Sequence, residues 1–246
     1  MSESKYTKEF VKLFDEMCYK KGLHKRSAWS DLMLMFACDI SNITEIREDI
    51  KKNRIKQYKE CEERLGGSDI PIRLLAILIQ ALSDTPGEDF LGKVYMNVGM
   101  GEKNWGQFFT PSSVASLMSR ITILQGADDN ITKNGYTSVA DPTVGSGAML
   151  LEAAETIRSM GHDVSSKALF FGQDLDYTSA CMAFVQLALT GCAALIVVGN
   201  SLTEPYTGNP LFVEDNGNYW YTPVLYTDAW NKRRIKYLKD KVKRTA

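Results

Sequence analysis

The sequence predicts an α/β fold in which a helical N-terminal domain precedes a parallel, Rossmann-like sheet. Two observations support this prediction. Apolar residues recur at helical spacing over residues 1–96, whereas residues 97–230 alternate short β-branched runs with helix-forming segments. Within the second part, residues 139–151 run from a β-branched segment through an Asp-Pro turn and two glycines into an apolar helix. This order places a nucleotide-like ligand against the carboxyl edge of a sheet.

The composition is typical of a globular protein, with 246 residues, 44% hydrophobic and 24% charged. The polar N-terminus does not resemble a signal peptide, and no apolar run approaches the roughly 20 residues of a membrane span. Five cysteines without a C-x-x-C pair, and two distant histidines, predict reduced thiols and no zinc cluster. We therefore expect a cytoplasmic protein with neither a membrane nor a metal partner.

Positive charge is concentrated at the C-terminal end. Residues 232–246 hold eight lysine and arginine side chains and one aspartate, although the formal net charge of the chain is −1. We expect residues 231–246 to form a basic tail that contacts phosphate backbones, or a solvated terminal helix. Four apolar positions of an amphipathic helix predicted at 230–242 are expected to face inward: Trp230, Ile235, Leu238 and Val242.

The N-terminal domain is predicted over residues 1–96. A highly charged helical segment at 44–65 stops at a glycine pair, and a strongly apolar helix is expected at 72–82. Thr85-Pro86-Gly87-Glu88 is a capping box with proline at the first helical position, so it predicts a short helix through Val94.

The second domain, predicted over residues 97–230, is expected to contain three parallel strands joined by helices. The strands are expected at 138–140, 168–172 and 194–198, and the helices at 148–160 and 177–189. A weaker pattern indicates a strand at 221–226. With three clear strands, one edge of the sheet is exposed unless residues 219–228 or another chain covers it.

The glycine turn after the first strand predicts the kind of ligand. Gly145 and Gly147 let a ligand approach the backbone, but position 150 is Leu, so the G-x-G-x-x-G pyrophosphate pattern is not met. Asp141 sits where it would repel a diphosphate. A cofactor with an amine and no phosphates fits better, and S-adenosylmethionine is such a cofactor.

Polar residues follow the other two strands. Asp174 ends the second strand and is placed to accept hydrogen bonds from ribose hydroxyls, and Asn200 ends the third and faces an adenine edge. Thr110 and Pro111 open a helix whose N-terminus attracts an anion such as a methionine carboxylate. Alternatively, Phe108 and its neighbour are core residues before an ordinary capped helix.

Four ordered motifs resemble the N6-adenine DNA methyltransferases, most closely the modification subunit of type I restriction–modification systems. The motifs are Gly106-Gln107-Phe108-Phe109-Thr110-Pro111, Asp141-Pro142-Thr143-Val144-Gly145-Ser146-Gly147, Gly172-Gln173-Asp174 and Gly199-Asn200-Ser201-Leu202. Asp89 to Tyr95 also resembles the segment that precedes the cofactor motif there. The resemblance covers roughly residues 70–202. It implies a class I S-adenosylmethionine-dependent methyltransferase domain. Because that family's sheet continues through further strands, we expect either a compact protein of this type or one half of an assembly.

The resemblance also implies roles for individual residues. The methionine part of the cofactor would be bound by Gln107, Phe108, Thr110, Pro111, Asp141, Thr143, Gly145 and Gly147. Asp174 would hold the ribose, and Leu175 and Asn200 would flank the adenine. The family more often has Asp at the Asn200 position, but an amide oxygen also accepts a hydrogen bond from an adenine amino group.

The catalytic motif departs from the family pattern. The family has Asn-Pro-Pro-Phe or Asn-Pro-Pro-Tyr, in which the Asn oxygen and a proline carbonyl accept the hydrogens of the adenine amine while the aromatic ring stacks on the flipped base. The candidate here is Asn209-Pro210-Leu211-Phe212, which lacks one proline. Asn209, Pro210 and Phe212 are therefore candidate catalytic residues, and the same tetrapeptide is also consistent with an ordinary turn.

Three functions fit these observations. The first is S-adenosylmethionine-dependent methylation of adenine N6 in DNA. The second is a catalytically silent, cofactor-binding partner or regulatory subunit of a modification system, acting with a partner subunit or as a homo-oligomer. The third is methylation of a protein or a small molecule.

Overall fold

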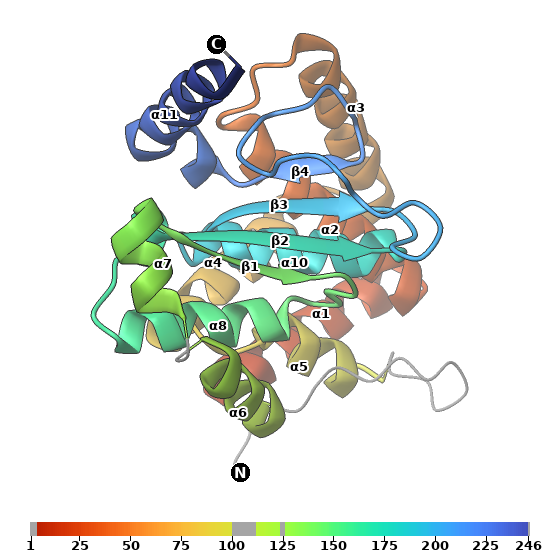
Figure 1. Ribbon diagram of the computed structural model, residues 1–246. Helices are drawn as coiled ribbons and strands as arrows, with labels where there is room; N and C mark the ends of the chain where they lie inside the picture. The colour runs from red at the N-terminus through yellow and green to blue at the C-terminus, as the bar shows by residue number, and fades with distance from the viewer. Residues whose placement is uncertain (1–3, 100–111, 124–125, 246) are drawn as a thin grey trace.

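Four strands form one sheet in the order β1-β2-β3-β4, with helices on both faces (Figure 1). The computed structural model describes residues 4–99, 112–123 and 126–245. The strands are β1 (Thr137–Asp141), β2 (Ala168–Asp174), β3 (Ala193–Val198) and β4 (Tyr219–Tyr221). The helices are α1 (Lys5–Lys21), α2 (Lys25–Asn42), α3 (Glu48–Leu65), α4 (Asp69–Asp84), α5 (Phe90–Asn97), α6 (Ser112–Ile123), α7 (Ala127–Asn134), α8 (Ala148–Ser159), α9 (Val164–Lys167), α10 (Tyr177–Leu189), the 3-10 helix η1 (Pro223–Tyr226) and α11 (Asp228–Thr245).

The first three strands are parallel and the fourth is antiparallel. Val139 of β1 pairs with Phe170 of β2, and Phe170 pairs with Ala194 of β3. β4 runs antiparallel beside β3, with Trp220 opposite Ile196. The predicted α/β architecture is therefore present, and residues 219–221 cover the β3 edge of the sheet.

Alternation along the strands divides the apolar residues between two faces. Phe170 and Ile196 point toward α8 and α10, whereas Leu169 and Leu195 point toward residues 205–230 and the start of α11. On the first face, α10 packs under β2 and β3, α8 packs under β1 and β2, and α6 packs against α8.

The N-terminal helices share one apolar core with the helices under the sheet. Trp29 of α2 is fully buried, and its Nε1 lies 3.5 Å from the sulfur of Met182 in α10. The rings of Phe14 and Tyr95 meet Trp29 edge-on, with centroids 5.5 and 5.8 Å away. Because the core continues across residue 96, the domain boundaries at 96 and 230 stay predictions from the sequence.

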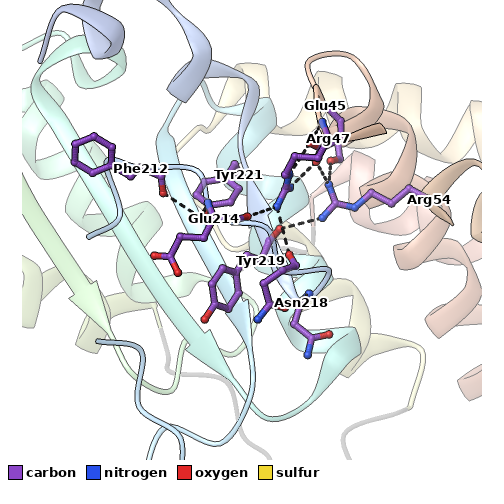
Figure 2. Close-up of polar contacts among 10 residues, drawn as sticks. Glu45, Arg47, Arg54, Phe212, Glu214, Asn218, Tyr219 and Tyr221 are labelled. Carbon is purple, nitrogen blue, oxygen red and sulfur yellow. Dashed lines mark hydrogen bonds and ion pairs between the residues drawn. The ribbon is translucent and has the colours of Figure 1, made fainter. Parts of the chain in front are cut away.

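A buried ionic cluster joins the N-terminal helices to the far edge of the sheet (Figure 2). One carboxylate oxygen of Glu45 accepts hydrogen bonds from both Arg47 and Arg54, each at 2.6 Å. Arg47 also donates to the carbonyl of Glu214 at 2.6 Å, and Arg54 donates to that of Tyr219 in β4 at 3.0 Å. The guanidinium of Arg54 lies over the ring of Trp220, 4.0 Å from its centroid. These contacts position β4.

Two local expectations are wrong. The helix expected from the capping box at 85–88 begins instead at Phe90, because the Asp89 side chain accepts the Gly92 N–H at 2.9 Å and caps it. The Thr85 hydroxyl donates to the Ala81 carbonyl of α4 at 3.0 Å. The strand expected at 221–226 is β4, which ends at Tyr221 before η1 begins.

The basic C-terminal helix lies at the amino ends of the strands (Figure 1). Trp230 is fully buried and donates to the Ser165 carbonyl at 2.8 Å, and Arg233 donates to that of Gly135 at 3.0 Å. Gly135 and Ser165 precede β1 and β2. The other apolar positions do not face inward as expected: their exposed fractions are 53% for Ile235, 50% for Leu238 and 67% for Val242.

All five cysteines are buried and unpaired. Burial raises the pKa of the Cys18 thiol to about 11 and the pKa values of Cys38 and Cys61 to about 12. Because the thiolate is the reactive form, these side chains behave as small apolar core residues.

Removing the Glu45 carboxylate should destabilise the protein. Glu45→Ala leaves two arginines without their buried partner, and we expect a loss of about 3–5 kcal/mol in the free energy of unfolding, measured by urea denaturation. The exposed Glu48→Ala is the control and should cost less than about 1 kcal/mol. Equal effects of the two substitutions would contradict a structural role for the cluster.

Candidate functional site

The carboxyl ends of the parallel strands bring the sequence-predicted residues to one edge of the sheet. β1 ends at Asp141, β2 ends at Asp174, and Asn200 follows β3 by two residues. This edge is opposite the end that holds α11 (Figure 1). Ligands of open α/β sheets bind at such an edge.

The glycine turn joins β1 to α8. The Asp141 carboxylate accepts the Thr143 N–H at 3.0 Å and so closes the start of the turn. Gly145 and Gly147 have φ values of +54° and +97°, in the left-handed region that favours glycine. A Cβ at Gly147 would lie only 3.2 Å from the Ala183 Cα of α10. Gly147 is therefore required for close packing between the turn and α10.

Asp174 ties the end of β2 to this turn. One carboxylate oxygen accepts the Gly145 N–H at 2.8 Å, and the other accepts the Asp176 N–H at 2.9 Å. Burial raises the pKa of the Asp174 carboxyl; the two backbone hydrogen bonds lower it, and the charges of Asp176 and Asp141 raise it. Each oxygen keeps a lone pair, so the carboxylate retains capacity for further donors.

Leu175 and Asn200 follow the ends of β2 and β3, and they differ in what their side chains contact: Leu175 is exposed, whereas Asn200 is hydrogen-bonded to the backbone. The Leu175 side chain is 70% exposed, which is unusual for a large apolar residue next to a buried strand. The Asn200 side-chain oxygen accepts the N–H groups of Leu202 at 2.9 Å and Thr203 at 3.2 Å. Both lone pairs of that oxygen are thus used locally, and a bond to an adenine amino group would require one of these to break.

The candidates Gln107, Phe108, Thr110 and Pro111 lie outside the described residues.

Within the described part of the chain, no group of histidine, cysteine, aspartate or glutamate side chains has the arrangement of a metal site. Over the same residues, no single helix is both long and apolar enough to cross a membrane.

The tetrapeptide Asn209-Pro210-Leu211-Phe212 forms a closed turn against α11. The Asn209 side-chain oxygen accepts the Leu211 N–H at 3.1 Å, and the Phe212 N–H donates to the Asn209 carbonyl at 2.9 Å. The Phe212 ring packs edge-on against Tyr237 of α11, with centroids 5.5 Å apart. Figure 2 shows Phe212 beside Tyr221, whose hydroxyl donates to the Phe212 carbonyl at 3.2 Å. No hydrogen bond among the described residues joins this turn to Asp174 or the glycine turn.

A buried polar network behind the glycine turn was missed from the sequence. Asp89 is 9% exposed, and its carboxylate accepts hydrogen bonds from Gly92 N–H, the Gln186 amide and the Ser146 hydroxyl. Gln186 also donates to the Ser146 carbonyl at 2.8 Å and accepts the Leu91 N–H at 2.9 Å. Burial raises the pKa of the Asp89 carboxyl above its usual range. The only sequence signal for this network was that Asp89 begins the segment Asp89 to Tyr95, which resembles a segment of the family.

Gln173 is a second missed residue. Its side chain is 2% exposed, its amide donates to the Glu204 carbonyl at 2.9 Å, and its oxygen accepts the Tyr206 N–H at 3.1 Å. Its backbone carbonyl accepts the Val144 N–H at 3.0 Å. Gln173 therefore holds both the glycine turn and the loop after β3 at the carboxyl edge.

Comparison with known proteins identifies a family and similar proteins. The model of the N-6 DNA methylase family matches residues 87–241. The type I restriction enzyme MpnII methylase subunit of Mycoplasma pneumoniae is 33% identical over 92 residues, which are 37% of this chain and 14% of that protein. The type I restriction-modification methyltransferase subunit of Streptococcus thermophilus, a crystal structure, has a TM-score of 0.42 at 17% identity, covering 84% of this chain and 60% of that one. The chain thus matches only a part of each of these proteins.

Truncating Asp89 should destabilise the protein more than replacing it with its isostere. Asp89→Ala leaves three buried donors unsatisfied, and we expect a loss of about 2–3 kcal/mol in the free energy of unfolding at pH 7. Asp89→Asn keeps an acceptor and should cost less than about 1 kcal/mol. Both values are measured by urea denaturation.

The pH dependence of the free energy of unfolding gives a second test of the role of Asp89. Because the folded pKa of Asp89 is raised, its contribution to stability is present at low pH and is lost as the pH rises through that folded pKa. Asp89→Asn should remove this loss. If the pH dependence of the free energy of unfolding is the same in Asp89→Asn as in the wild type, the raised pKa of Asp89 is not its source.

Proposed function

Because the chain belongs to the N-6 DNA methylase family, we propose that it binds S-adenosylmethionine and takes part in methylation of adenine N6 in DNA, as a modification subunit of a type I restriction–modification system. The observation that carries this proposal is the contact between Asp174 and the glycine turn. A half-buried carboxylate at the end of β2 is held 2.8 Å from the Gly145 N–H, and it retains acceptor capacity.

The residues at this edge fit the cofactor. The ribose hydroxyls are donors that the remaining lone pairs of Asp174 accept, and the exposed Leu175 offers an apolar surface for the adenine ring. The turn formed by Asp141 and Thr143 through Gly147 is proposed to bind the methionine part. Gln107, Phe108, Thr110 and Pro111 are proposed for the same role from the sequence alone. The cofactor supplies an electrophilic methyl group on a sulfonium. The chain supplies orientation of that group and a preformed turn.

DNA is the proposed acceptor. The exposed lysines of α11 give the phosphate backbone a place to bind, at a strength that falls with salt. Because α11 lies at the amino ends of the strands, DNA bound there would have to extend across the sheet to reach Asp174. A partner subunit is therefore part of the proposal.

A second candidate function is favoured by the turn at Asn209. In a working catalytic motif the Asn209 oxygen would be free to accept the adenine amine, but it accepts the Leu211 N–H. Phe212 packs on Tyr237 and does not offer a stacking face to a base at the cofactor edge. This arrangement favours a cofactor-binding partner whose acceptor site comes from elsewhere. The catalytic roles of Asn209, Pro210 and Phe212 remain the alternative.

Asp174→Ala should lower the affinity for S-adenosylmethionine by about 1–3 kcal/mol, because the ribose hydroxyls lose a charged acceptor. Calorimetric titration measures this. Affinity for the cofactor in the wild type should also fall as the pH drops through the raised pKa of Asp174, since a protonated carboxyl accepts less well.

The matched control is Asp163→Ala. The Asp163 carboxylate also accepts a backbone N–H, that of Ser165 at 3.1 Å, but it caps α9 before β2 begins. This variant should bind the cofactor as the wild type does. If Asp174→Ala also binds with unchanged affinity, the proposed ribose contact is wrong.

Asn209→Ala should leave cofactor affinity unchanged and lower the free energy of unfolding by about 0.5–1.5 kcal/mol, because a turn hydrogen bond is lost. Asn216→Ala is the control, since its oxygen accepts the Asn218 N–H at 2.9 Å in a similar turn. Methyl transfer to mixed-sequence DNA is measured in both variants. Loss of transfer in Asn209→Ala alone would establish the catalytic alternative.

A further inference from the structure

Gln186 is a buried polar side chain in an apolar stretch of α10. It is fully buried, and so are its neighbours over residues 179–187 of this helix. A buried amide costs free energy unless its hydrogen-bonding groups find partners. The Gln186 oxygen accepts the Leu91 N–H at 2.9 Å. The nitrogen donates to the Asp89 carboxylate at 2.9 Å and to the Ser146 carbonyl at 2.8 Å. The amide is therefore fixed in one orientation between α5 and the glycine turn.

Ser146 is the residue of the glycine turn that this network holds. Its hydroxyl donates to the Asp89 carboxylate and its carbonyl accepts from Gln186, so both its side chain and its main chain are fixed. Ser146 lies between Gly145 and Gly147, which both have positive φ values. Glycine has the most conformational freedom to lose, so a turn with two glycines samples many conformations if nothing holds it. Buried hydrogen bonds to the residue between them restrict this turn.

The first turn of α5 leaves space for the Asp89 carboxylate. Gly92 is buried within this helix, where glycine is less favourable than alanine. A Cβ at Gly92 would overlap the Asp89 carboxylate. Alanine at position 92 would therefore displace that carboxylate from the place where it accepts the Ser146 hydroxyl. The glycine is required by the position of the carboxylate and not by the helix.

We propose that Asp89 and Gln186 are positioning residues for the cofactor. They hold Ser146, and through it the glycine turn, in the conformation that binds the methionine part of S-adenosylmethionine. Both side chains are buried behind the turn, so they act through the turn and not by contact with the cofactor. A turn that is already ordered does not have to be ordered when the ligand binds, and this raises the affinity. The inference rests on the proposed function.

The arrangement of donors predicts which substitution of Asp89 is tolerated. One carboxylate oxygen accepts two N–H donors, from Gly92 and Gln186, and the other faces the Ser146 hydroxyl. Asparagine fits this pattern, because its oxygen accepts the two N–H groups and its NH₂ group donates to the hydroxyl, which then acts as the acceptor. Asp89→Asn should therefore keep the turn ordered, whereas Asp89→Ala should not.

A matched control separates positioning from a purely structural role. The Thr222 side chain is fully buried, and its hydroxyl donates to the Cys192 carbonyl at 2.7 Å and accepts the Ala194 N–H at 2.8 Å. These partners lie at the start of β3, the end of the sheet opposite the glycine turn. Thr222→Val removes a buried hydroxyl that is hydrogen-bonded, as Ser146→Ala does, but leaves the glycine turn unaffected.

The test measures S-adenosylmethionine binding by calorimetric titration, and hydrogen exchange of the amides of residues 143–147 without cofactor. The full chain is studied at a temperature where circular dichroism shows each variant folded. Four substitutions disturb the network: Ser146→Ala, Gly92→Ala, Gln186→Met and Asp89→Ala. We expect each to raise Kd about tenfold and to speed exchange of the turn amides about tenfold, the effect of one lost hydrogen bond to a charged group. Asp89→Asn and Thr222→Val should stay within about threefold of the wild type in both measurements.

Several outcomes would overturn the positioning role. If Asp89→Ala does not fold, the milder Ser146→Ala and Gly92→Ala decide. Wild-type values of Kd or of turn exchange in these two variants would overturn the role, and so would an equal loss of affinity in Thr222→Val. A loss in Asp89→Asn as large as in Asp89→Ala would also overturn it, because the charge and not the geometry would then be responsible. If the wild type does not bind the cofactor, the proposed function fails, and turn exchange decides separately whether the network holds the turn.

Discussion

The buried carboxylate of Asp89 is the constraint on which the geometry of the carboxyl edge depends. A carboxylate removed from water needs donors, and Asp89 takes them from α5, the glycine turn and α10 at once. The turn is therefore held from behind, and Asp174 holds it from the side through Gly145. Glu45 performs a similar function at the other side of the sheet, where its arginines hold β4 and the preceding loop. The N-terminal helices are thus attached to both sides of the sheet by buried acids.

This arrangement explains why the carboxyl edge of the sheet is well connected, whereas the tetrapeptide at Asn209 is not joined to it. The turn, β2 and the loop after β3 are connected by backbone hydrogen bonds that Gln173 and Asp174 organise. The tetrapeptide at Asn209 belongs to a different part of the molecule, the apolar cluster under Trp230 and Leu225. The tetrapeptide that resembles the family's catalytic motif is thus not connected to the glycine turn by any hydrogen bond among the described residues.

Much of the fold could be predicted because it is encoded locally. α10 spans the residues expected for it, 177–189, since Asp176 caps its start and a Thr-Gly pair follows its end. The strand at 168–172 extends two residues further, to Asp174. Periodicity could not show which face of α11 is covered: Ile235 and Leu238 match the amphipathic pattern, but their side chains are about half exposed. The role of Asp89 was equally hidden, because its partners Ser146 and Gln186 are 57 and 97 residues away in the chain.

The five buried cysteines have a practical consequence. Each thiol is enclosed in the core, so a thiol reagent reaches it only when the surrounding structure opens. Cys61 lies in α3 and Cys181 in α10 beneath the sheet, so their labelling rates report on two different regions of the molecule. The protein thus contains its own probes of local opening, without any engineered site.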